Sequence, residues 1–168
     1  MRTATRTFRL ITTWRVPAPA GQVWDILAEP GFTWPDWWPS LTRESSGAIT
    51  GPDGYGGAGS WARLRVRSPV GAALVIRLDL VESRAPGADR SGRARLRVSG
   101  DLRGGASVLV SEQPGDQSEV RLTWVVTPTR GWTARAARRA PALCEWSHAR
   151  VMRAGERGLV RHVLSTSS

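Results

Sequence analysis

Apolar and polar residues alternate along most of the middle of the chain. A period of two indicates strands of an antiparallel sheet with one buried and one solvated face. The strongest alternation occurs in four segments, residues 62–66, 74–80, 94–98 and 120–126. Residues 8–16 and the weaker segment 41–49 contain β-branched or aromatic residues and predict two more strands. Glycine and proline predict turns at 68–71, 85–92, 104–105 and 114–116.

Helical spacing replaces this alternation in two parts of the sequence, between the first two predicted strands and after the last one. Residues 20–27 carry Val23, Trp24 and Leu27 on one face, which predicts a short helix. The tryptophan- and proline-rich segment 34–38 predicts one further helical turn. From about residue 141 to residue 164, apolar residues share one face and arginines share the opposite face. This pattern predicts a long amphipathic helix.

The order of these elements predicts an α+β domain built from one sheet and one long helix. A curved antiparallel sheet of about six to seven strands would wrap around the long C-terminal helix, with two short helices after the first strand. A curved sheet cannot contact a straight helix along its whole length, so a gap is expected between them. Gaps lined by apolar side chains are common ligand sites. We therefore expect an internal apolar cavity.

Composition limits the other features of the chain. Its 168 residues, 40% hydrophobic and 23% charged, fit one globular domain with a core spanning about residues 8–164. One cysteine and two histidines are too few for a disulfide or a four-ligand zinc site, and we expect no metal and no cofactor. The sequence contains no long apolar run and no convincing signal peptide, which predicts a cytoplasmic monomer or homodimer without a membrane span.

The net charge of +10 comes from arginine alone, because the sequence contains no lysine. Eight arginines alternate with inward positions and would form the outer face of the sheet. Nucleic-acid binding usually adds a groove-reading helix or aromatic residues among the basic ones, and neither pattern occurs here. A solvated face is the favoured interpretation, and binding of an anionic partner remains an alternative. The eight are Arg63, Arg65, Arg67, Arg77, Arg93, Arg95, Arg97 and Arg121.

Several local motifs resemble the START-like superfamily (helix-grip, SRPBCC), and within it the bacterial polyketide cyclase/dehydrase-like group. The motifs are PAPAGQVWDILAEPGFTWPDWWP, GYGGAGSWARLRV, SGDLRGG, VRLTWVV and WSHARVMRAGERGLVRHVL. The resemblance covers roughly residues 11–164. It implies the helix-grip fold, and a function among those of polyketide aromatase/cyclases, lipid binders and hormone binders. A fold alone does not select one of these functions.

The candidate site residues are mainly aromatic. Tryptophans at the rim could stack on a ring or an acyl chain, or form a small core of their own. Tyr55, in a glycine-rich loop that we interpret as a gate at the cavity mouth, could offer its hydroxyl to a ligand or anchor the loop. The predicted ligand-binding set is Trp34, Trp37, Trp38, Tyr55, Leu64, Leu78, Leu96, Val98, Trp124, His148 and Met152.

His148, on the buried face of the last helix, is the one catalytic candidate. It could transfer protons or bind a ligand, or it could be structural. Cys144 lies one turn away, but a thiolate pair within one helical turn is not expected. Because the inward strand positions are apolar, the sequence favours binding of an aromatic, polyketide-like or lipid-like molecule. A cofactor-independent polyketide aromatase/cyclase is the alternative.

Overall fold

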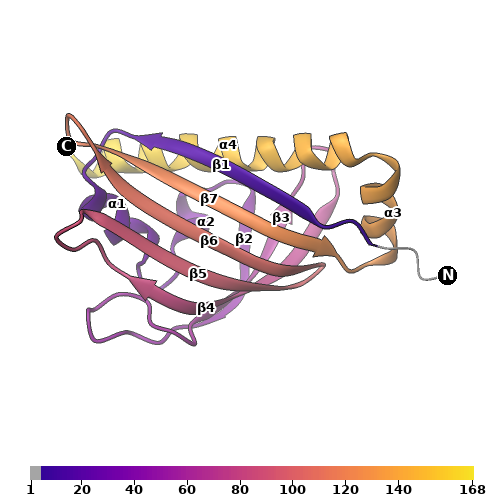
Figure 1. Cartoon of the computed structure of the whole chain (residues 1–168), viewed down its shortest axis with the longest axis horizontal. Helices are drawn as coiled ribbons and strands as arrows, with labels where there is room; N and C mark the ends of the chain where they lie inside the picture. The colour runs from indigo at the N-terminus through magenta and orange to yellow at the C-terminus, as the bar shows by residue number, and fades with distance from the viewer. Residues whose placement is uncertain (1–4) are drawn as a thin grey trace.

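Seven antiparallel strands form one curved sheet with a long helix running along it (Figure 1). The computed structural model describes residues 5–168. The strand order is β1-β7-β6-β5-β4-β3-β2. The strands are β1 Phe8–Val16, β2 Leu41–Gly47, β3 Trp61–Arg67, β4 Ala73–Arg84, β5 Ser91–Gly100, β6 Leu102–Gln113 and β7 Gln117–Pro128. The helices are α1 Ala20–Leu27, α2 Trp34–Trp37, α3 Gly131–Arg139 and α4 Pro141–Thr166. The predicted helix-grip architecture is confirmed.

Two local features differ from the prediction. Gly104 and Gly105 do not form a turn, because they lie inside β6, and the β5–β6 turn falls at Gly100 and Asp101. A side chain at Gly104 would overlap the carbonyl of Val125 on the neighbouring strand, so this glycine permits close strand pairing. The nine-residue helix α3 was not predicted, because Trp132 is its only large apolar residue.

Helices α2 and α4 approach each other closely at two glycines of α4. A Cβ atom at Gly155 would lie 2.5 Å from the Trp38 indole, and one at Gly158 would overlap the carbonyl of Trp37. The Trp38 Nε1 atom also donates a hydrogen bond to the Val151 carbonyl at 2.9 Å. These contacts fix the middle of α4 against α2 and the residue that follows it.

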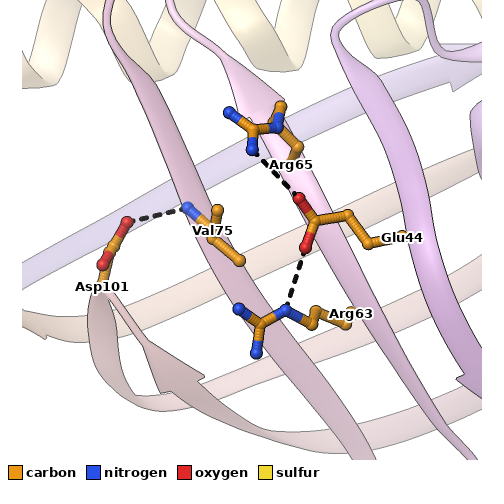
Figure 2. Close-up of polar contacts among 5 residues, drawn as sticks. All are labelled: Glu44, Arg63, Arg65, Val75 and Asp101. Carbon is orange, nitrogen blue, oxygen red and sulfur yellow. Dashed lines mark hydrogen bonds and ion pairs between the residues drawn. The ribbon is translucent and has the colours of Figure 1, made fainter.

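A buried carboxylate connects the sheet to α3. Asp101 is 3% exposed, and its Oδ2 atom accepts a hydrogen bond of 2.8 Å from the Val75 amide (Figure 2). Its Oδ1 atom pairs with the Nε atom of Arg130 at 2.5 Å, directly before α3 begins. The Thr129 amide donates to the Asp101 carbonyl at 2.9 Å. Asp101 therefore helps to fix α3 against the end of the sheet.

We expect the substitution D101A to lower the free energy of unfolding by about 2 kcal/mol, measured by urea denaturation. The reason is that the Val75 amide loses its charged acceptor inside the protein. The variant R130A should cost less, because the Arg130 side chain is 59% exposed and Asp101 keeps its hydrogen bond from the Val75 amide. D101N, which keeps an acceptor oxygen, should fall between them. Equal losses for D101A and R130A would contradict this explanation.

Candidate ligand-binding site

Two cavities lie between the sheet and the helices. The larger has a volume of about 230 Å³ and is bounded by strands of the sheet and by α2, α3 and α4. The smaller has a volume of about 70 Å³ and lies beside α1 and the segment that leads to α2. Both walls are mainly apolar.

The larger cavity takes its walls from three sides. The sheet contributes inward side chains such as Leu64, Ile76 and Val126, which the period-two pattern directs to one face. Helix α2 contributes Trp34, and the residue directly after it contributes the Trp38 ring. Helix α4 contributes one stripe of neighbouring side chains, Cys144, Ser147, His148, Val151 and Met152.

The larger cavity opens to solvent at one end of the sheet. Its lining there includes Val70 in the β3–β4 turn, Trp132 on α3 and Leu143 at the start of α4. These side chains are 52%, 42% and 48% exposed, respectively. The mouth is therefore formed by segments that sequence reasoning did not connect with the site.

The predicted site residues separate into three groups. Six line the larger cavity: Trp34, Trp38, Leu64, Trp124, His148 and Met152. Leu78 and Leu96 line the smaller cavity, together with Trp34. Trp37, Tyr55 and Val98 line neither cavity. Trp37 packs against α4, and Val98 is buried in the core. An inward-pointing side chain is therefore not sufficient evidence that a residue lines a cavity.

Tyr55 takes the anchoring role, the second of its two predicted alternatives. Its hydroxyl donates a hydrogen bond of 2.6 Å to Asp25 Oδ1, which raises the pKa of the tyrosine. Its ring meets Trp24 edge-on at 6.5 Å. The glycine-rich loop is also bonded through the Gly56 amide to the carbonyl of Ala28. It borders the smaller cavity, and the mouth of the larger one lies elsewhere.

His148 is the most unusual polar group in the wall of the larger cavity. Burial lowers its pKa to about 4, so the imidazole is neutral at pH 7. Its Nε2 atom and the Nε1 atom of Trp124 are both buried with no hydrogen-bond partner among residues 5–168, and the two rings meet edge-on at 6.3 Å. Burial also raises the pKa of the Cys144 thiol, which keeps it protonated.

The chemistry available in the larger cavity is that of an uncharged, mostly apolar surface. Among the described residues, its lining includes no carboxylate and no guanidinium group. His148 thus has no acidic partner in the wall with which to form an acid–base pair. Within residues 5–168, histidine, cysteine and carboxylate side chains also do not cluster in any group that could hold a metal ion.

Sequence reasoning missed part of the lining. Phe8 and Leu10 line the larger cavity from β1, and they share the inward phase of Trp14 in that strand. That phase could have identified them. Helix α3, which the sequence pattern did not predict, contributes Trp132, Thr133 and Ala136 to the lining.

The arginine-rich outer face is partly neutralised. Glu44 lies between Arg63 and Arg65, at 2.9 and 3.2 Å from their nitrogens (Figure 2). The hydrogen bond from Arg63, together with the charge of Arg65, lowers the pKa of Glu44. Five of the eight arginines form such ion pairs: Arg63, Arg65, Arg77, Arg95 and Arg121. Acidic groups are thus interspersed on this face.

Comparisons with solved structures identify the architecture. A START superfamily protein from Mycobacterium smegmatis has a TM-score of 0.65 at 14% identity, covering 94% of this chain and 98% of that one. The Zhui aromatase/cyclase from Streptomyces sp. R1128 has a TM-score of 0.63 at 20% identity, covering 97% of both chains. The chain has the START-like helix-grip fold.

The same helix-grip fold also appears in a third solved structure. Norcoclaurine synthase from Thalictrum flavum, a point mutant in complex with a transition-state analogue, has a TM-score of 0.61 at 15% identity. That comparison covers 99% of this chain and 100% of the other. No protein-family model and no curated protein sequence matches the chain. In residues 5–168, no helix combines the length and the apolar character needed to cross a membrane.

Proposed function

We propose that the protein binds a hydrophobic small molecule, aromatic, polyketide-like or lipid-like, in the larger cavity. The observation that carries this proposal is an apolar cavity of about 230 Å³ that opens to solvent at one end. Protein cores are close-packed and rarely contain voids larger than a water molecule. Ligand sites are concave and mostly apolar, and this cavity has both properties.

The composition of the wall favours binding over catalysis. Four tryptophan rings, those of Trp34, Trp38, Trp124 and Trp132, and the thioether of Met152 offer large, polarizable surfaces. The polar candidate, His148, is neutral at pH 7 and has no carboxylate beside it in the wall. Uncharged apolar ligands lose little hydration free energy in such a site, whereas charged ones lose much.

Native mass spectrometry of the purified protein is the direct test. We expect a co-purifying apolar molecule, released when the protein is denatured. A quantitative test uses phenylnaphthylamine, a neutral fluorescent probe that has no charge to attract to the arginine face. The protein should bind this probe with a one-to-one stoichiometry. No binding, together with no co-purifying molecule, would contradict the proposal.

We expect the substitution V66W to weaken phenylnaphthylamine binding by about tenfold or more, which is about 1.4 kcal/mol. Val66 is half-buried on β3 and lines the larger cavity, so an indole there would occupy the space of the ligand. The matched control is V81W, because Val81 is 39% exposed on β4 and lines neither cavity. Fluorescence titration measures both affinities. Equal affinities in V66W and V81W would place the probe outside the cavity.

A further inference from the structure

The two cavities lie next to each other along the same face of the sheet. Ala62 of β3 pairs with Leu78 of β4, and both line the smaller cavity. The next inward pair along these strands, Leu64 and Ile76, lines the larger cavity. Two residues along a strand correspond to about 7 Å. The floor is therefore continuous from one cavity to the other.

One side chain above this floor borders both cavities. Trp34 is the only residue of the described chain that lines both. It is 6% exposed, and its Nε1 atom donates a hydrogen bond of 2.9 Å to the carbonyl of Leu27. Its ring also packs on Phe32 at 4.9 Å and stacks on Trp38 at 6.0 Å. The indole is thus held in one orientation.

We propose that Trp34 is a partition that sets the length of the ligand. With Trp34 in place, a ligand entering from the mouth would fill the larger cavity and stop against the indole. Without it, the smaller cavity, about 70 Å³, would extend the site past α2 toward α1. This inference rests on the proposed function, because it identifies which residue limits the size of the bound molecule.

The volumes support a limiting role for this residue. The larger cavity alone, about 230 Å³, is below the range of about 300–1,000 Å³ that is typical of small-molecule sites. Joining the smaller cavity and the space of the indole would bring the site into that range. The wall of the smaller cavity is also mainly apolar, with Leu27, Leu80 and Val108 among its residues. A longer apolar chain would therefore find a suitable surface beyond the partition.

The test compares the binding of saturated fatty acids from octanoic to hexadecanoic acid, measured by calorimetry on the full chain. Their carboxylate can stay in solvent at the mouth and is the same in every acid, so only the length of the alkyl chain inside the cavity varies. In the wild-type protein, affinity should rise with chain length until the larger cavity is full, and then stop rising. In W34A, the rise should continue to longer acids. Burying two further methylene groups corresponds to about tenfold in affinity. We therefore expect the ratio of the affinity for the longest bound acid to the affinity for octanoic acid to be about tenfold larger in W34A than in the wild-type protein.

The matched control is W37A. Trp37 is a neighbouring tryptophan that is buried to a similar degree, at 5% exposure, but lines neither cavity. W37A should therefore lose stability and keep the wild-type length dependence. If W34A does not fold, W34L is the second variant, since it keeps an apolar group on α2 while shortening the partition.

The outcomes separate the inference from the proposed function. An unchanged length dependence in folded W34A or W34L would overturn the partition, although binding itself would stand. A shift of the same size in W37A would also overturn it, because the effect would then come from loosened packing. If no acid binds to any of these proteins and phenylnaphthylamine also fails to bind, the proposed function fails and the partition fails with it.

Discussion

The substitution G158A should lower the free energy of unfolding by about 3 kcal/mol or more. A methyl group at this position would overlap the carbonyl of Trp37, so α4 and α2 would have to separate. Overpacking of this kind typically costs about 1–3 kcal/mol, and the cost is greatest when the obstacle is backbone, which cannot rotate away. Thermal unfolding should show a decrease of about 10 °C in the melting temperature.

The same substitution in α1, G21A, should not lower the free energy of unfolding. A Cβ atom at Gly21 would meet no atom within 4 Å, and the residue is exposed. Alanine is the better helix former by up to about 1 kcal/mol, so G21A should be neutral or stabilising. A G158A protein as stable as G21A would mean that α2 and α4 leave room for a methyl group between them.

The titration of His148 alone should lower the free energy of unfolding by about 3 kcal/mol as the pH decreases from 7 to 4. Burial lowers the pKa of His148 to about 4, against an ordinary value of 6.5 for histidine. Between these two values the unfolded chain binds a proton that the folded protein does not, so acidification favours unfolding. About 2 kcal/mol should be lost already at pH 5, before most carboxylates titrate.

The variant H148L isolates this contribution. It removes the titrating group and places an apolar side chain in an apolar wall, so the decrease in stability between pH 7 and pH 5 should become much smaller. H162L is the control for removing a histidine from the same helix, since His162 lines neither cavity. Urea denaturation at each pH gives the free energies. A wild-type decrease in H148L would show that other groups cause the pH dependence.

The sheet and its long helix could be predicted because their patterns are strong. In β7, buried Val120, Leu122 and Val126 alternate with more exposed neighbours, and this period fixes both the strand and its face. In α4, the buried positions from Met152 to Val163 recur at helical spacing. Such patterns report local geometry and burial, which are the properties that a single sequence encodes directly.

The division of the inner face into core and two cavities could not be predicted in the same way. Leu64, Leu78 and Val98 all point inward, yet they lie in the larger cavity, the smaller cavity and the packed core, respectively. Alternation gives the direction of a side chain but not what lies opposite it. That depends on where α2 crosses the sheet, and therefore on contacts between distant segments such as Trp37 and Gly158.

The two ends of helix α4 differ in burial, so their amide hydrogens should exchange with solvent at different rates. All five of its buried residues lie at or after Met152, whereas Leu143 and Trp146 near its start are each 48% exposed. Segments with few buried contacts open locally at a lower free energy than the whole domain. We expect the amide hydrogens of the first turns to exchange with deuterium well before those around Leu159. A ligand could then enter and leave by fraying of these turns while the sheet stays folded.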